Sequence, residues 1–163
     1  MFREMRRAKQ ALSREDCEAV LRRGTSGVLA LLGDGGYPYA VPLSYDYRNG
    51  KLYFHSAGEG HKLDALRRCP RASFCVIDQD RVVPLERTTY FRSVIAFGAL
   101  RVLEDEAEKR AAIEALALRY SAEDAPENRA ASIARSWNVL AMLELSIEHM
   151  TGKEAIELAA GRE

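Results

Sequence analysis

A glycine-rich turn in the middle of the chain is followed by two side chains that can carry positive charge. The stretch His55-Ser56-Ala57-Gly58-Glu59-Gly60-His61-Lys62 ends a β-rich segment and leads into a helix expected over about residues 62–68. Glycines let the backbone approach a ligand closely, and free N–H groups at a helix start attract anions. Lys62 adds a fixed charge and His61 a titratable one. This pattern favours binding of a phosphate monoester, with an ordinary polar loop as the alternative.

Signatures of other common sites do not occur. The chain has no G-x-x-x-x-G-K-[ST], no G-x-G-x-x-G after a strand and no G-x-S-x-G, so P-loop, Rossmann and serine hydrolase sites are not supported. His55 and His61 lack the i, i+4 spacing of a helical metal pair, and Cys69 lies too far along to complete a tetrahedral set. We therefore expect no metal site. Cys17, Cys69 and Cys75 form no C-x-x-C pair and are interpreted as reduced, apolar packing residues.

Composition restricts the class of protein. The 163 residues contain 24 Lys+Arg and 24 Asp+Glu, so the formal net charge is zero. This argues against a nucleic-acid partner, because proteins that bind nucleic acids carry a clustered excess of basic residues. The N-terminus has no apolar stretch behind its positive charges, and no apolar run reaches the length of a membrane helix. We expect a cytoplasmic protein with no membrane contact. The length and the absence of linkers predict one domain over residues 1–163, with its core at about residues 13–153.

Local signals predict the elements that must position these residues. Ser13 is a good N-cap for a helix over about residues 14–23. Asn49-Gly50 separates two β-rich segments and predicts a type I′ hairpin. Pro38 and Pro42 exclude a regular central strand and predict an edge, a bulge or a bend. Further strands are expected over residues 28–32, 72–77, 88–103 and 139–148, with Gly98 marking a bulge. Further helices are expected from residue 104 to about 120, with Ala111 on its apolar stripe, and over residues 126–137.

The order of these elements predicts the fold class. Helices lie between some of the strands but do not alternate with every strand, which favours α+β over a doubly wound parallel sheet. We expect a mainly antiparallel split β-barrel of about six strands with peripheral helices, because closure removes exposed strand edges.

Several motifs, taken in order, resemble a known family. The sequence is similar to the pyridoxamine 5′-phosphate oxidase-like FMN-binding split barrels, and most closely to the branch that contains 5-nitroimidazole resistance proteins. The resemblance covers about residues 13–153. The motifs that carry it are Gly36-Tyr37-Pro38-Tyr39-Ala40-Val41-Pro42-Leu43-Ser44-Tyr45, Leu52-Tyr53-Phe54-His55-Ser56-Ala57, Gly60-His61-Lys62-Leu63-Asp64, Ser93-Val94-Ile95-Ala96-Phe97-Gly98 and Thr151-Gly152-Lys153.

The resemblance implies FMN bound at a homodimer interface, with each of the two sites lined by both chains. It places the strand over residues 40–45 along the isoalloxazine ring. His61-Lys62 falls on the family's phosphate-binding Arg-Lys pair, and Ser93, next to Arg92, on a glutamine that reaches FMN. Lys62 is matched identically. The residues so expected to bind FMN are Val41, Pro42, Leu43, Ser44, Tyr45, His55, Ser56, Ala57, Gly60, His61, Lys62, Arg92, Ser93 and Lys153.

The same resemblance gives an expected activity. In the nitroimidazole-resistance branch a histidine near the flavin is thought to act on substrate or electron transfer, so His55 is the expected catalytic residue; a half-buried structural histidine is the alternative. Tyr120 and Trp137 are interpreted as core or dimer packing. We expect a flavin-dependent oxidoreductase that reduces a small aromatic or nitroaromatic compound. The oxidase's C-terminal substrate-binding segment has no counterpart, so we do not expect vitamin B6 oxidation. The alternatives are a non-catalytic flavin carrier or sensor, and a barrel that binds deazaflavin or haem.

Overall fold

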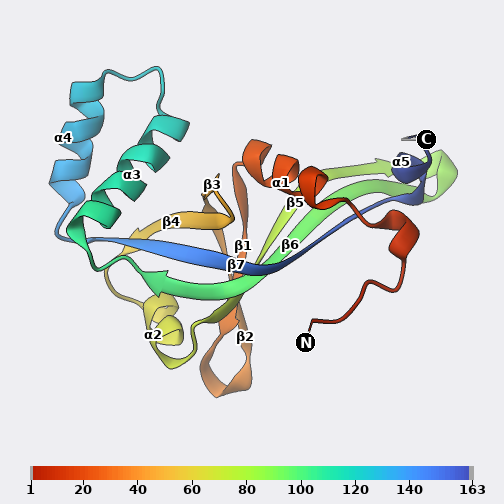
Figure 1. Cartoon of the computed structure of the whole chain (residues 1–163), viewed down its shortest axis with the longest axis horizontal. Coiled ribbons are helices and arrows are strands. Elements are labelled where there is room, and N and C mark those ends of the chain that lie inside the picture. Colours follow the sequence, from red (N-terminus) through yellow and green to blue (C-terminus); the bar gives the residue numbers. More distant parts are fainter. Residues whose placement is uncertain (1, 162–163) are drawn as a thin grey trace.

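Seven β-strands and five α-helices make up the computed structural model, which describes residues 2–161 (Figure 1). The strands are β1 (Ser26–Leu32), β2 (Pro38–Ser44), β3 (Asp46–Arg48), β4 (Lys51–Ala57), β5 (Arg71–Val83), β6 (Thr88–Val102) and β7 (Leu140–Glu154). The helices are α1 (Arg14–Arg23), α2 (His61–Arg68), α3 (Glu106–Tyr120), α4 (Pro126–Ser136) and α5 (Ile156–Ala160). Short 3-10 turns occupy Ala8–Gln10, Asp34–Gly36 and Pro84–Glu86.

All seven strands belong to one antiparallel sheet, in the order β2-β1-β5-β6-β7-β4-β3. The predicted fold class is therefore confirmed, with one strand more than expected. Strand β2 lies at the edge of the sheet and pairs only with β1, so its prolines interrupt no second ladder. The edge position predicted from Pro38 and Pro42 is confirmed.

The hairpin predicted at Asn49-Gly50 is formed by β3 and β4. Arg48 pairs with Lys51, and the two residues between them have positive φ angles of 50° and 77°. Positive φ at both positions is what a type I′ turn requires, and asparagine and glycine tolerate it best. This turn fixes the register of β4 and with it the direction in which His55 points.

Gly98 marks the bulge that the sequence predicts. The pairing of β6 with β7 shifts between Phe97 and Gly98, which face His149 and Ile147. A Cβ atom at Gly98 would lie 1.9 Å from the carbonyl oxygen of Ser146, so only glycine fits there.

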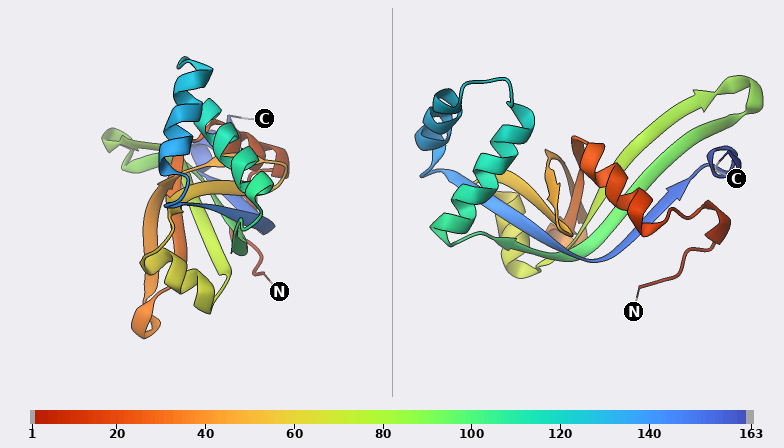
Figure 2. Two further views of the ribbon diagram at one scale, coloured as in Figure 1. Left: turned by 90° about the vertical axis from the view of Figure 1, so that its left-hand side faces the viewer. Right: turned by 45° about the horizontal axis from the view of Figure 1, so that its top comes forward.

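Two strands are longer than the sequence indicated. We predicted a strand over residues 72–77 followed by an irregular segment, but β5 continues to Val83 and forms an arm with β6 that reaches away from α3 and α4 (Figures 1 and 2). Strand β7 likewise runs to Glu154 instead of residue 148. Charged residues such as Asp78, Asp80 and Arg81 remove the apolar alternation, while pairing with β6 supplies the backbone hydrogen bonds.

Side-chain caps begin two of the helices; the cap at Ser13 was predicted from the sequence and the cap at Asp105 was not. Ser13 accepts a hydrogen bond from the Asp16 backbone N–H, and Asp105 accepts one from the N–H of Glu108. We predicted Ala111 on the apolar stripe of α3, but it is exposed. The neighbouring residue Ala112 is buried instead, because the helix directs position 112 toward the sheet.

Two apolar clusters hold the elements together. One fills the interior of the coiled sheet around Tyr45, Phe54 and Phe74 and includes the buried face of α1. The second lies where α3 and α4 cover the start of β7, around Met142 (Figure 1). Among the helices of residues 2–161, none is long and apolar enough to cross a membrane.

Candidate functional site

Lys62 and Ser56 meet at the end of β4. The Lys62 ammonium donates a hydrogen bond of 2.8 Å to Ser56 Oγ, and Ser56 is buried. Lys62 is half-buried, and burial lowers the pKa of its ammonium below the ordinary lysine value. No carboxylate in the described part of the chain forms an ion pair with it. Gly60, with φ of 113°, caps the start of α2 beside it. This partly desolvated positive charge without a counter-ion suits an anionic ligand.

His61 lies against the loop between β1 and β2. Its Nε2 is 3.3 Å from Asp34 Oδ2, and its ring contacts that of Tyr39 with 4.1 Å between centroids and the two planes tilted by 31°. Arg68 donates a hydrogen bond of 2.6 Å to the other oxygen of the same carboxylate. His61 is thus already engaged, and Lys62 is the cation of the predicted pair with its charge available.

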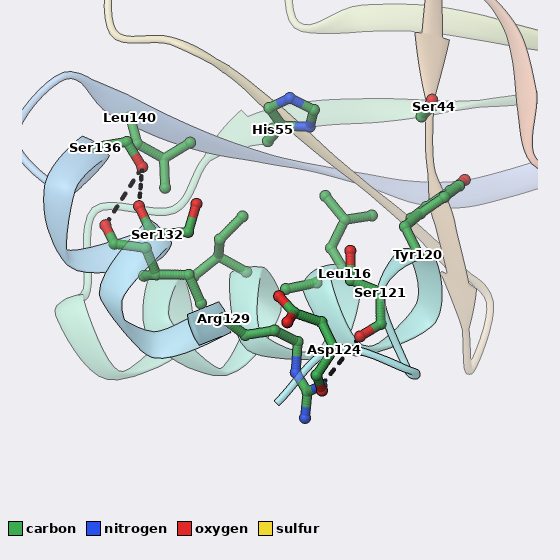
Figure 3. A pocket seen from close by; sticks show the side chains of 13 residues that line it. Ser44, His55, Leu116, Tyr120, Ser121, Asp124, Arg129, Ser132, Ser136 and Leu140 are labelled. Atoms are coloured by element: carbon green, nitrogen blue, oxygen red, sulfur yellow. Dashed lines mark hydrogen bonds between the residues drawn. The ribbon is translucent and has the colours of Figure 1, made fainter. Parts of the chain in front are cut away.

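A cavity of about 520 Å³ lies between the sheet and the α3–α4 hairpin (Figure 3). Strands β2 and β4 supply Ser44 and His55, two of the predicted site residues. The rest of the lining is an apolar surface with several hydroxyls and, at the helical loop, one Arg and one Asp: Ile113, Leu116, Ala117, Tyr120, Ser121, Asp124, Arg129, Ser132, Ile133, Ser136 and Leu140. Figure 3 shows His55 on the sheet side and Arg129 on the helix side. Such a lining suits a small aromatic molecule with polar substituents.

Strand alternation separates His55 from Ser56. Successive side chains of a strand point to opposite faces. Phe54 and Ser56 are buried on one face of β4, while His55 and Ala57 are exposed on the other. The predicted residues of this segment therefore form two neighbouring places: Ser56 with Lys62, and His55 with Ser44.

The predicted β2 residues divide in the same way. Pro42 and Ser44 are exposed, and Val41 and Leu43 pack against the core. Tyr45 is fully buried, and its hydroxyl donates to the backbone carbonyl of Leu21. The expectation that Tyr45 binds the cofactor is corrected for its side chain, which belongs to the core; its backbone N–H and carbonyl both contact the Tyr120 hydroxyl.

Ser93 and Lys153 lie far from Lys62 within one chain. They pair with each other between β6 and β7, whereas His55 pairs with Met142 at the other end of β7. Eleven residues of strand separate Met142 from Lys153, or about 35 Å at the usual rise per residue. Figure 1 shows the two ends of β7 on opposite sides of the molecule. The predicted residues therefore do not form a single site within one chain.

Arg92 faces the opposite side of β6 from Ser93. Its Nε donates to Glu154 at 2.9 Å and its Nη1 to Asp78 at 3.2 Å. Asp78 also accepts two hydrogen bonds of 2.6 Å from Arg23 of α1. Arg92 thus belongs to an ion-pair network that ties α1 to the arm, and its charge is already compensated. Arg23 and Arg92 hold the pKa of Asp78 below its ordinary value although burial acts to raise it.

The residues on α4 were missed by the sequence analysis. Arg129, Ser132 and Ser136 recur at spacings of three and four and so share one face of the helix. That spacing indicates a shared polar face, but a polar face of a helix is ordinarily exposed to solvent and does not by itself predict a binding site. It becomes part of a cavity only because α4 folds back over β4.

The His, Cys, Asp and Glu side chains are candidate metal ligands, and the cysteines are candidate reactive thiols. Within residues 2–161 no cluster of three or more His, Cys, Asp or Glu side chains is placed to hold a metal ion. The three cysteines are unpaired thiols. Burial raises the pKa of the Cys17 thiol to about 11, which keeps it protonated and unreactive at neutral pH.

The fold and the site together define a split β-barrel with the half-buried Lys62 ammonium at the end of β4 and a cavity at His55. The pyridoxamine 5′-phosphate oxidase family model matches residues 13–154, and the chain belongs to this family of flavin-binding split barrels. The resemblance stated from the sequence is thereby confirmed. Among curated protein sequences, none matches this chain.

Solved structures share the fold. A candidate 5-nitroimidazole antibiotic resistance protein from Bacteroides thetaiotaomicron is 22% identical, with a TM-score of 0.74 over 88% of this chain and 86% of that one. An FAD-binding protein from Mesorhizobium loti is 26% identical, with a TM-score of 0.65 over 90% and 97%. An FAD- and haem-binding protein from Mycobacterium smegmatis is 24% identical, with a TM-score of 0.68 over 90% and 73%.

Proposed function

We propose that the chain binds FMN, with the phosphate at Lys62. The observation that carries this proposal is the half-buried Lys62 ammonium, which has Ser56 but no carboxylate beside it. A phosphate monoester carries a charge near −2 and several acceptor oxygens, and it satisfies both groups. The N–H groups at the start of α2 add donors in the same place.

The proposed site needs a second copy of the chain. Ser93 and Lys153 lie on a sheet face that also exposes Ile77, Ile95 and Val28, and Ile77 is 66% exposed. An apolar sheet face open to water favours a partner surface. In a homodimer, Ser93 and Lys153 of the partner subunit would complete the site begun by Lys62. Such a symmetric pair contains two equivalent sites.

For the cavity at His55 we propose reduction of a small aromatic or nitroaromatic compound. FMN supplies the redox chemistry when bound. The apolar side chains of α3 and α4 pack against the aromatic ring and exclude water, and the hydroxyls of Ser44 and Ser132 bind its polar substituents. His55 holds a proton on its ring nitrogen and passes it to the substrate.

The relatives favour a second cofactor candidate. Two of the similar structures are described as FAD-binding, and one of them also as haem-binding. FAD shares the ring and the first phosphate of FMN, so the same Lys62 would serve both. A flavin carrier or sensor without turnover is the alternative to an enzyme.

The visible spectrum of the purified protein, with FMN or FAD added in turn, tests the cofactor. Absorbance maxima of bound oxidised flavin support the proposal, and a colourless protein that ignores both flavins refutes it. NADH or NADPH is then added, followed by a nitroimidazole. Bleaching and reoxidation indicate an enzyme, whereas a bound flavin that neither donor reduces indicates a carrier or sensor.

A further inference from the structure

A second cavity, of about 500 Å³, lies where the N-terminal segment meets α5. It is lined by Arg6, Arg7, Ala8, Lys9, Gln10 and Ile156, none of which belongs to the cavity at His55. The N-terminal segment is fixed to β7 just beyond these residues. Ala11 forms a β-bridge with Lys153, and Leu12 N–H donates to the Gly152 carbonyl at 3.0 Å. The cavity therefore has an anchored wall.

The charge of this cavity is uniformly positive. Arg6, Arg7 and Lys9 line it, and no acidic residue does. Across the described residues, none of the three forms a salt bridge. Guanidinium groups present paired donors that match the oxygens of a phosphate. Three uncompensated cations within four positions attract a dianion more strongly than a single charge does.

Gln10 gives an independent indication of a ligand. It is only 6% exposed, and its Oε1 has no hydrogen-bond partner in the described structure. A buried amide oxygen without a donor costs free energy, which a hydroxyl or amino group would recover. The exposed side chain of Ile156 offers an apolar surface next to it. The cavity volume lies in the range typical of small-molecule sites and exceeds what one inorganic ion fills.

We propose that this cavity binds a small organic phosphate of about mononucleotide size, at a site separate from the proposed flavin site. Arg6, Arg7 and Lys9 hold the phosphate. Gln10 accepts a hydrogen bond from a hydroxyl or amino group of the ligand, and Ile156 packs against its ring.

Isothermal titration calorimetry with AMP tests this site. The full chain is loaded with FMN and freed of unbound flavin by gel filtration before the titration, so that AMP does not report on the flavin site and free FMN does not compete for the cavity. We expect saturable binding that weakens about fivefold or more in Arg6→Ala and in Arg7→Ala. Arg3→Ala is the matched control, because Arg3 lies in the same segment, is exposed and does not line the cavity. Gln10→Leu should weaken AMP binding while leaving inorganic phosphate binding unchanged.

Each other outcome overturns the proposal. Absence of AMP binding does so directly, as does binding that Arg6→Ala and Arg7→Ala leave intact. An equal loss in Arg3→Ala would show attraction to the charged segment without a site. Inorganic phosphate that binds as tightly as AMP would show that Gln10 and Ile156 contribute nothing. The test does not depend on flavin binding, since a chain that binds no FMN gives the same titration.

Discussion

Removal of the Lys62 ammonium should weaken flavin binding more than removal of any exposed charge in α2. Its partly desolvated charge faces no carboxylate, so a phosphate gains the full charged hydrogen bond. We expect Lys62→Ala to cost roughly 1.5–3 kcal/mol of FMN affinity. Quenching of FMN fluorescence on titration measures this. Arg67→Ala is the control, because Arg67 is exposed in the same helix and pairs with Asp64 at 2.9 Å. Equal affinity of Lys62→Ala and wild type would remove Lys62 from the site.

His55 should matter for turnover and not for cofactor retention. It lines the cavity, on the face of β4 opposite to Ser56 and Lys62. We expect His55→Ala to bind FMN normally and to slow nitroimidazole reduction by about 100-fold or more, the usual effect of losing a general acid. Stopped-flow reoxidation of the reduced protein measures this. His149→Ala, which removes a histidine stacked on Phe2, should leave the rate unchanged. A His55 variant with normal turnover would contradict the catalytic role.

At the scale of single residues, the sequence predicts contacts between residues that are close together in the chain. The pairing of Lys62 with Ser56 joins positions six apart and follows from the loop that links β4 to α2. By contrast, Arg92 binds Glu154, 62 positions away, and no local pattern indicates that its charge is compensated. The burial of Tyr45 has the same origin, since it depends on α1 packing over the link between β2 and β3.

The elements depend on a few long-range polar contacts, of which the Tyr120 hydroxyl is the clearest. It accepts a hydrogen bond of 3.2 Å from the Tyr45 N–H, and its one proton faces two backbone carbonyls, that of Thr25 just before β1 and that of Tyr45 in the β2–β3 link. Tyr120→Phe leaves the Tyr45 N–H without this partner, so we expect a loss of about 1–3 kcal/mol in the free energy of unfolding. Urea denaturation measures it. Tyr37→Phe, at an exposed residue, should have no effect.

A second element-scale contact joins β4, β6 and β7. The buried Glu144 carboxylate accepts hydrogen bonds from Lys51 at 3.1 Å and Arg101 at 3.0 Å. Burial acts to raise its pKa, but these cations hold the pKa of Glu144 below the ordinary glutamate value of 4.5. The stabilisation is therefore present above that value and is lost as the pH falls through the lower folded-state pKa.

This predicts a pH-dependent difference between wild type and Glu144→Gln. Urea denaturation at pH 7 should find the variant less stable. The stability difference should narrow as the pH falls from about 4.5, where Glu144 of the unfolded chain takes up a proton, through the lower pKa of Glu144 in the folded state. If the difference in unfolding free energy between the two proteins did not change with pH, the charge of the Glu144 carboxylate would contribute nothing to stability.

The types of the secondary-structure elements could be predicted where the residue pattern was local, but the lengths of the strands could not. The residue types alone predict the turn at Asn49-Gly50 and the bulge at Gly98. The outer half of β5 contains charged residues in no alternating order, and only its pairing with β6 makes it a strand. The α3–α4 cavity is unpredictable for the same reason, because it exists only through the packing of α4 over a distant strand.

For the whole molecule, the separation of Lys62 from Lys153 has a direct consequence. If both hold the same flavin, they come from different protomers. Within one chain Lys62 contacts Ser56, which pairs with the start of β7, and Lys153 lies at the other end of β7. Lys62→Ala and Lys153→Ala should each weaken FMN binding as pure homodimers. Their mixture should recover binding, because a mixed dimer carries one site in which both lysines are intact and one in which both are lost.

The amount recovered is fixed by the symmetry. After complete exchange of equal amounts of the two variants, half of the dimers are mixed, so about a quarter of all sites should regain wild-type affinity. Titration of the mixture with FMN measures this fraction, and size-exclusion chromatography establishes that the species is a dimer. A mixture of Lys62→Ala with Arg67→Ala is the control for the count of intact sites, because Lys153 is intact in both chains and the result is the same with or without exchange of subunits. In that mixture Lys62 is present in half of the chains, so half of the sites should bind. If the two lysines acted within one chain, the first mixture would recover nothing. If the flavin lay wholly at Lys62, Lys153→Ala alone would bind FMN normally.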